Sequence, residues 1–171
     1  GTWAWQSRTV RALMGWLILA STWLSVIYLL TFDHGALLLV LLVVGVAAAD
    51  IGAYFSGRRW GRHKLAPSVS PGKTWEGLWG GLAAVMVITL IIWQSLPLAY
   101  THLEVQSLLL MGLFLAGASI LGDLTVSMVK RYSGVKDSGA MLPGHGGLLD
   151  RIDSICGAAP VFALGLILMG Y

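Results

Sequence analysis

Four aspartates lie in or beside long apolar stretches of the sequence: Asp50, Asp123, Asp150 and Asp153. A charged side chain at the centre of a bilayer costs at least ~2.5 kcal/mol, so an ionisable residue in an apolar segment is a candidate for function. Asp150 and Asp153 are three residues apart, which places both on one face of a helix. The alternative is that each aspartate pairs with a neighbouring Lys or Arg and has only a structural role.

Other polar residues follow Asp50 and Asp123 along the sequence at helical spacing. One stripe comprises Asp123, Ser127 and Lys130, and a second comprises Asp50, Tyr54, Gly57 and Arg58. Residues spaced by three or four positions share one face of an α-helix. Polar stripes on separate helices at the same depth predict a pocket that opens toward one face of the membrane.

The residue types around the aspartates favour a hard divalent cation. The sequence has a single cysteine, Cys156, and its four histidines are scattered. Oxygen ligands suit Mg²⁺ or Mn²⁺, and Mg²⁺ typically takes one or two carboxylates and completes its shell with water and substrate phosphates. Aspartates beside Lys and Arg therefore predict a site for a metal ion and phosphate, and with it phosphoryl or nucleotidyl transfer.

Two loops carry further candidates for phosphate binding. Residues 70–77 contain Gly-Lys-Thr but do not form a Walker A motif, because position 67 is proline where that motif requires glycine. The segment can still present Ser70, Lys73 and Thr74 to a phosphate at a helix N-terminus, which favours anions. The second loop, residues 132–149, contains Lys136 and places His145 among glycines that let a ligand approach the backbone closely.

Five apolar blocks are the elements that would position these residues. They cover residues 13–30, 36–55, 78–98, 105–129 and 155–171. The chain of 171 residues is 57% hydrophobic and only 11% charged, which excludes a water-soluble enzyme, a disordered chain and a disulfide-stapled secreted domain. A helix of about 20 residues crosses a bilayer. The sequence therefore predicts an all-α polytopic membrane protein with about five spans, in one domain over residues 1–171.

The basic residues predict the orientation of these spans. Of eleven Lys and Arg, two precede the first block, five lie between the second and third, and four lie between the fourth and fifth. With five spans these places fall on one side, which the positive-inside rule identifies as the cytoplasm. We therefore expect a cytoplasmic N-terminus and an active site facing the cytoplasm. The membrane itself is expected to be a bacterial inner membrane. On charge alone, the basic loops could equally serve only topology and anionic lipid headgroups.

The polar residues after the fourth block follow a pattern that resembles the signature of phosphatidate cytidylyltransferases, also called CDP-diacylglycerol synthases. The pattern covers about 27 positions and includes SMVKR at 127–131, KDSG at 136–139, LPGHGG at 142–147 and DRID at 150–153. Residues 50–77 are also similar to this family, and the resemblance extends over residues 50–160. Members usually have several more hydrophobic helices ahead of the matching region, so we expect a fragment or shortened form.

The resemblance implies an enzyme that joins CTP and phosphatidic acid to give CDP-diacylglycerol and pyrophosphate. It implies Mg²⁺ dependence, a second cation such as K⁺, a homodimer and contact with membrane lipids, and no nucleic-acid partner. Asp123, Asp150 and Asp153 would hold the metal ion. The catalytic set would comprise Asp123, Asp150 and Asp153 with Lys73, Lys130 and Arg131. The remaining substrate contacts would be Asp50, Tyr54, Arg58, Ser70, Thr74, Ser127, Lys136, His145, Gly146 and Arg151.

Two alternatives stay open at the level of the sequence. A different CTP-dependent lipid enzyme, such as a CDP-archaeol synthase or a polyprenol kinase, shares the metal and CTP chemistry and differs mainly in its acceptor. An ion transporter would also place carboxylates in a membrane. A transport pathway needs access from both sides, however, and here the carboxylates gather at one end of the spans.

Overall fold

The computed structural model describes residues 7–95, 104–135, 138–139, 147 and 149–170, without the side chains of Asp150 and Arg151. Its described elements are α2 (Arg8–Leu30), α3 (Gly35–Trp60), β1 (Lys64–Ala66), β2 (Ser70–Thr74), α4 (Trp75–Ser95), α5 (Val105–Tyr132) and α6 (Leu149–Leu168). Helices α2 to α5 are each long and apolar enough to cross a membrane, and α6 has a shorter apolar stretch over Ile152–Leu168. The prediction of an all-α polytopic membrane protein is confirmed.

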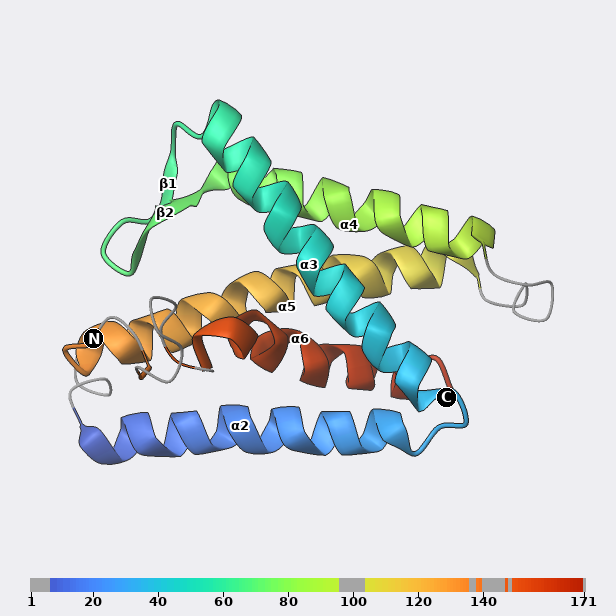
Figure 1. Cartoon of the computed structure of the whole chain (residues 1–171), viewed down its shortest axis with the longest axis horizontal. Coiled ribbons are helices and arrows are strands. Elements are labelled where there is room, and N and C mark those ends of the chain that lie inside the picture. The colour runs from blue at the N-terminus through green and yellow to red at the C-terminus, as the bar shows by residue number, and fades with distance from the viewer. Residues whose placement is uncertain (1–6, 96–103, 136–137, 140–146, 148, 171) are drawn as a thin grey trace.

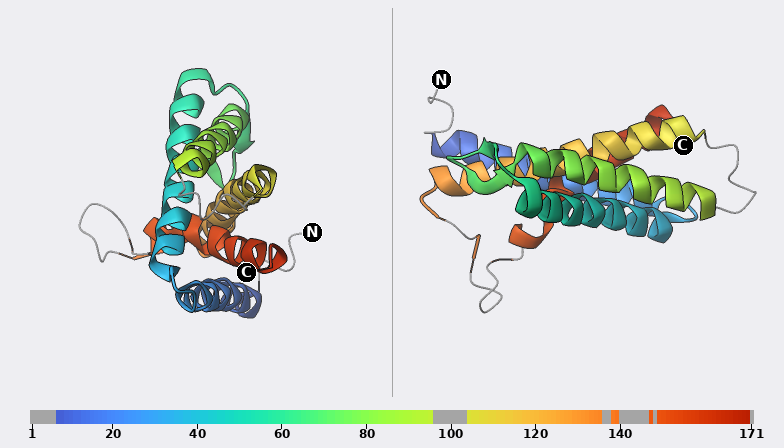
Figure 2. Two further views of the ribbon diagram at one scale, coloured as in Figure 1. Left: turned by 90° about the vertical axis from the view of Figure 1, so that its right-hand side faces the viewer. Right: turned by 90° about the horizontal axis from the view of Figure 1, so that it is seen from above.

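The helices form a layer that is crossed by one tilted helix. Figure 1 shows α5 and α6 side by side, with α2 beyond α6 and α4 beyond α5, while α3 runs diagonally across them. The end-on view in Figure 2 shows α3 extending along one side of the stack. Helix α3 packs most extensively against α4, and α5 packs most extensively against α6. Helix α3 thereby contacts all four of the other described helices.

Small residues allow the close contacts in both of these helix pairs. A Cβ atom added at Gly81 of α4 would lie 2.8 Å from the carbonyl oxygen of Ala49 in α3. A Cβ at Gly122 of α5 would lie 2.6 Å from the Cα of Gly157 in α6. Helices in a membrane associate through such small-residue contacts, because lipid is as apolar as the side chains and gives no hydrophobic driving force between helices.

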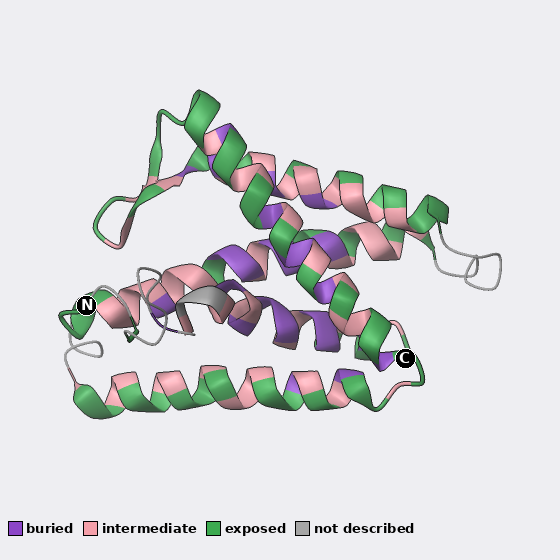
Figure 3. Cartoon of the chain, viewed as in Figure 1, coloured by how far each residue is buried: buried purple, intermediate pink, exposed green. Residues whose placement is uncertain are grey.

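The buried core lies where α3 crosses α5 and α6, as the purple segments in Figure 3 show. It includes Leu42 and Val46 of α3, Leu115 of α5 and Phe162 of α6. Large apolar side chains also face outward, and Trp16 of α2 is 76% exposed. An exposed apolar surface on long helices fits a lipid environment.

The connections between the helices alternate between the two ends of the bundle. The first residues of α2 and α6 and the last residues of α3 and α5 lie toward one end, where the β1–β2 hairpin also lies (Figure 1). This end therefore carries the basic segments around residues 58–73 and 130–131, in the arrangement that the positive-inside argument requires.

A short antiparallel hairpin replaces the loop that the sequence indicated between α3 and α4. Strands β1 and β2 pair with Lys64 opposite Thr74 and Ala66 opposite Ser70, with a shift in register between them. The strands have three and five residues, and the second contains Pro71 and Gly72, which disfavour strands. The hairpin therefore depends on its contacts with the helix ends rather than on local propensity.

Candidate active site

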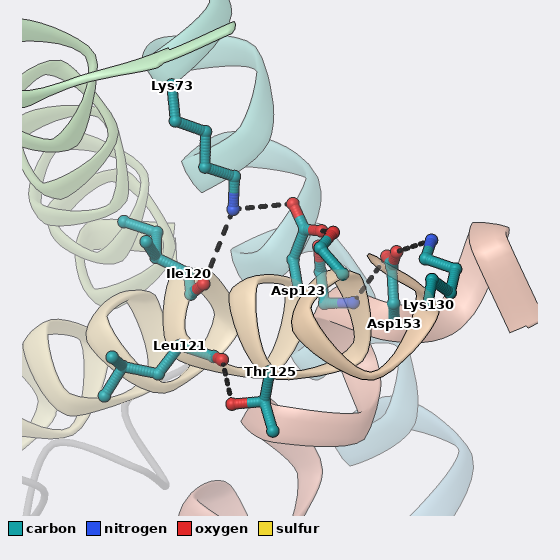
Figure 4. A network of polar contacts seen from close by, with 9 residues as sticks. Lys73, Ile120, Leu121, Asp123, Thr125, Lys130 and Asp153 are labelled. Carbon is teal, nitrogen blue, oxygen red and sulfur yellow. Dashed lines mark hydrogen bonds and ion pairs between the residues drawn. The ribbon is translucent and has the colours of Figure 1, made fainter. Parts of the chain in front are cut away.

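Lys73 connects the hairpin to Asp123, the first residue of the polar stripe on α5. Its Nζ lies 2.6 Å from Oδ2 of Asp123, and both side chains are about a quarter exposed, at 24% and 26%. The same ammonium group donates a hydrogen bond to the carbonyl oxygen of Ile120 at 3.4 Å (Figure 4). The other oxygen of Asp123, Oδ1, accepts a hydrogen bond from the Ser127 hydroxyl at 3.1 Å. Both oxygens of Asp123 are therefore engaged.

The position of Lys73 is set by the junction that directly follows it. Thr74 is buried, and its hydroxyl accepts a hydrogen bond from the backbone N–H of Gly77 at 3.1 Å, which caps α4. The backbone N–H of Trp75 also donates to the carbonyl oxygen of His63 at 3.0 Å. The His63 ring nitrogen Nδ1 lies 2.7 Å from Oε1 of Glu76. These contacts fasten both ends of the hairpin to the start of α4.

A second ion pair joins α5 to α6. Nζ of Lys130 lies 3.8 Å from Oδ2 of Asp153, and these side chains are only 14% and 13% exposed. Oδ1 of Asp153 accepts a hydrogen bond from the backbone N–H of Ser154 at 2.9 Å. The close packing of Gly122 against Gly157 brings α5 and α6 together one helical turn from Asp153. Helix α6 begins at Leu149, so it includes both Asp150 and Asp153.

Asp50 of α3 lies in the same group of charges. The side chain of Ser154 hydrogen bonds to the Asp50 carboxylate, and Asp123 and Lys73 both act on it electrostatically. Asp153 likewise experiences the charges of Asp123, Lys130 and Lys73. We call this group the polar cluster; its members are Asp50, Lys73, Asp123, Lys130 and Asp153. Three helices and the hairpin contribute to it, as the stripes in the sequence predicted.

The donor set of the polar cluster is compatible with a divalent cation. Within the described part of the chain, no group of three or more Asp, Glu, His or Cys side chains is close enough to hold a metal ion. Mg²⁺ needs only one or two carboxylates when substrate phosphates complete its shell. Asp123 and Asp153 supply carboxylate oxygens alone, which suits this ion. Asp150, the third predicted ligand, has its side chain outside the described residues, so its role stays a prediction.

Three other predicted residues lie on helices that contribute to the polar cluster. Arg131 donates from Nε to the carbonyl oxygen of Val69 at 3.3 Å, which joins the end of α5 to the hairpin. On α3, Nη1 of Arg58 donates to the Tyr54 hydroxyl at 2.9 Å, and both side chains are exposed. Tyr54 and Arg58 continue the stripe of Asp50 toward the helix end, whereas Gly57 faces Thr74 and Gly77 of the hairpin–α4 junction.

The remaining predicted residues divide into two groups. Ser70 begins β2 and Thr74 ends it, so Ser70 lies on the hairpin while the buried Thr74 hydroxyl serves as a helix cap. Lys136, His145 and Gly146 lie outside the described residues, as does the side chain of Arg151. The roles proposed for these last four residues therefore stay predictions.

Sequence reasoning missed two buried serines near the polar cluster. Ser154 binds Asp50, and its position directly after Asp153 at the start of an apolar helix was an available signal. Ser119 lies one turn before Asp123 on α5, and its hydroxyl is buried without a hydrogen-bond partner, the one such side-chain atom in the described part of the chain. A serine in an apolar helix carries no signal of its own, because it commonly bonds a carbonyl of its own helix.

An apolar cavity lies at the opposite end of the bundle. Its volume is about 320 Å³, and its lining includes Phe32, His34, Val85, Leu115 and Phe162. None of the five members of the polar cluster lines it. The charged chemistry is therefore placed at the polar cluster and not in this cavity.

Known proteins resemble the chain over most of its length. A phosphatidate cytidylyltransferase from Pseudomonas aeruginosa is 48% identical over 167 residues, covering 98% of this chain and 61% of that protein. One from Haemophilus influenzae is 50% identical over 131 residues, covering 76% of this chain and 46% of that protein. One from Synechocystis is 45% identical over 139 residues, covering 81% and 46%.

This chain thus spans about half the length of the curated relatives that it matches. A family model described as the cytidylyltransferase family matches residues 2–169. The match includes α3, the hairpin, α5 and α6, which supply all five members of the polar cluster. The chain belongs to the cytidylyltransferase family.

Proposed function

We propose that the chain carries the catalytic region of a phosphatidate cytidylyltransferase. The reaction joins CTP and phosphatidic acid to give CDP-diacylglycerol and pyrophosphate. The observation that carries the proposal is the polar cluster, in which Lys73, Lys130 and three aspartates converge at one end of a membrane-spanning bundle. The names of the relatives support the choice of substrates.

The reaction needs little acid–base chemistry from the protein. A phosphate oxygen of phosphatidic acid forms a bond to the α-phosphorus of CTP, and the bond from that phosphorus to the oxygen that bridges to the β-phosphate breaks. Pyrophosphate leaves with that bridging oxygen. Because the attacking phosphate is already ionised near neutral pH, positioning and the neutralisation of charge carry most of the rate.

The lysines of the polar cluster are suited to hold phosphates. Lys73 and Lys130 come from different elements and point toward the same group of carboxylates. Their ammonium groups would bind the triphosphate and the lipid phosphate, and Arg131, Arg58 and Ser70 lie on the elements beside them. An Mg²⁺ ion, when bound, would neutralise phosphate charge and polarise the α-phosphate. Asp123 and Asp153 would hold this ion, together with Asp150; a second cation such as K⁺ is proposed with it.

The membrane setting gives the lipid substrate direct access. The apolar helices make the chain an integral membrane protein. We place the polar cluster at the cytoplasmic face of a bacterial inner membrane, where both CTP and the headgroup of phosphatidic acid can reach it, and we propose a homodimer. The basic residues at this end support that orientation.

The proposal is tested by incubating the purified chain with labelled CTP, Mg²⁺ and a panel of lipid acceptors. We expect CDP-diacylglycerol from phosphatidic acid, and none when Mg²⁺ is removed by a chelator. Conversion of a polyprenol but not of phosphatidic acid would instead identify a lipid kinase. Movement of a labelled ion across liposomes without any turnover of CTP would identify a transporter.

A further inference from the structure

The two lysines that are proposed to bind phosphate are already paired with the two carboxylates that are proposed to bind the metal ion. Lys73 lies 2.6 Å from Asp123, and Lys130 lies 3.8 Å from Asp153. A lysine and a divalent cation compete for the same carboxylate oxygen, because their positive charges repel one another at this short range. We therefore expect the lysine to leave Oδ2 of Asp123 when that oxygen binds a cation.

We propose that Lys73 and Lys130 exchange partners when ligands bind. In the ligand-free protein they neutralise Asp123 and Asp153, and they turn to phosphate oxygens when a nucleoside triphosphate and a divalent cation arrive together. The exchange rests on the proposed function, since it requires a phosphate ligand at the polar cluster. Its consequence is that the cation and the nucleotide bind cooperatively, each making the site more favourable for the other.

The charges of the polar cluster explain why the exchange is needed. Three carboxylates and two ammonium groups leave the ligand-free cluster with one net negative charge. A triphosphate alone would meet three carboxylates, whereas a divalent cation alone would meet two ammonium groups. When both ligands bind, the cation faces the carboxylates and the lysines face the phosphates, so each repulsion is replaced by an attraction.

The surroundings of Lys73 permit this movement. Its side chain is 24% exposed, so solvent and ligand can reach its ammonium group. A flexible four-carbon stem carries the charge, and the backbone of β2 can stay in place because Thr74 fastens it to α4. Asp123 keeps its orientation through the hydrogen bond from Ser127 to its other oxygen. Only the lysine has to move.

A purely structural ion pair predicts the opposite result when the lysine is removed. If Lys73 serves only to hold Asp123 in place, its loss disorders the carboxylate and weakens cation binding. If Lys73 competes with the cation, its loss strengthens cation binding in the absence of nucleotide. The sign of the change therefore separates the two interpretations.

The test measures Mn²⁺ binding to the purified chain in detergent, without nucleotide, from the electron paramagnetic resonance signal of free Mn²⁺. We expect Lys73→Met to bind Mn²⁺ about tenfold more tightly than the parent chain, within the usual range of coupling between sites. Lys130→Met should show a smaller gain, because its pair is longer. Lys73→Arg, which keeps the charge, should show no gain.

The matched control is Lys64→Met, which removes one positive charge from the same hairpin at an exposed position opposite Thr74. Its Mn²⁺ affinity should equal that of the parent chain. The exchange would be overturned if Lys73→Met and Lys130→Met bound Mn²⁺ no more tightly than the parent chain, or not at all. Failure of the proposed function is recognised separately, because it abolishes the formation of CDP-diacylglycerol by the parent chain and leaves the order of Mn²⁺ affinities intact.

Discussion

Two carboxylates of the polar cluster, those of Asp123 and Asp153, each divide their two oxygens between different partners. One oxygen of Asp123 pairs with Lys73, and the other accepts a hydrogen bond from the Ser127 hydroxyl. One oxygen of Asp153 faces Lys130, and the other accepts a hydrogen bond from the backbone N–H of Ser154. One oxygen of each aspartate is thus fixed by an uncharged donor, while the other faces a lysine. The uncharged donor orients the carboxylate, and the charged partner is the one that a ligand can replace.

At the residue scale, Asp153→Asn should lower the rate of CDP-diacylglycerol formation by on the order of a hundredfold, the usual cost of losing one charge-stabilising contact. The amide keeps the shape of the side chain but cannot hold a cation as a carboxylate does. The rate is measured with labelled CTP. The matched control is Asp33→Asn, the same substitution at an exposed residue at the other end of the bundle, which should keep the parent rate. Equal rates for both variants would contradict a role for Asp153.

Thr74 provides a second residue-scale prediction. Thr74→Val removes the hydroxyl that caps α4 and should lower the free energy of unfolding by about 1 kcal/mol, whereas Thr74→Ser should keep it. Thermal unfolding in detergent measures the difference. A raised KM for CTP in Thr74→Val without any loss of stability would contradict a purely structural role and support the substrate contact that the sequence indicated for Thr74.

The residues of the polar cluster were predictable because ionisable side chains are rare in apolar segments. Asp50, Asp123 and Asp153 were recognisable in this way. The helical stripe that begins at Asp123 added Lys130, and the Gly-Lys-Thr segment added Lys73. The pairing of each lysine with a particular aspartate was not predictable, since it depends on where the hairpin ends and how closely α5 approaches α6. The contact of Ser154 with Asp50 was missed because it depends on how α6 lies against α3. Ser119 was missed because a serine within an apolar helix carries no signal of its own.

At the scale of elements, the approach of α5 to α6 depends on glycines that leave no room for a side chain. A Cβ at Gly122 would lie 2.6 Å from the Cα of Gly157 and 3.0 Å from the carbonyl oxygen of Asp153. The contact between Gly122 and Gly157 lies one helical turn along α6 from Asp153, which pairs with Lys130. Separation of the two helices therefore changes the site as well as the stability.

Gly122→Ala should accordingly destabilise the protein by about 1–3 kcal/mol, the usual cost of overpacking, and lower its activity. Gly117→Ala is the matched control on the same helix, because a Cβ there has no neighbour within 4 Å. The two variants are compared by thermal unfolding and by the rate of CDP-diacylglycerol formation. Parent-like stability of Gly122→Ala would show that α5 and α6 are not packed as described.

The helices themselves were largely predictable from the length of their apolar blocks. The block predicted over residues 105–129 corresponds to α5, which spans Val105–Tyr132. The last helix begins at Leu149, before the predicted start at 155, because the polar residues around Asp150 and Asp153 lie inside its first turns. The hairpin was not predictable, since its short strands contain proline and glycine and are held by contacts with α3 and α4.

At the scale of the whole molecule, the orientation in the membrane decides which substrates reach the polar cluster. A cysteine introduced at Ser68, on the exposed turn of the hairpin, should react with a membrane-impermeant thiol reagent only from the cytoplasmic side. A cysteine at Thr31, between α2 and α3, should react only from the other side. The native Cys156 is buried and should stay unreactive. Labelling of both positions from one side would overturn the proposed orientation.

The central claim is that the polar cluster binds CTP together with a divalent cation, and CTP binding to Asp123→Asn tests it most directly. Equilibrium dialysis with labelled CTP measures the affinity of the variant and of the parent chain, with Mg²⁺ and without it. Loss of one negative charge should strengthen CTP binding without Mg²⁺ and weaken it with Mg²⁺, because the carboxylate repels phosphate but attracts the cation that bridges to it. Identical CTP affinities in the variant and the parent chain under both conditions would contradict the claim.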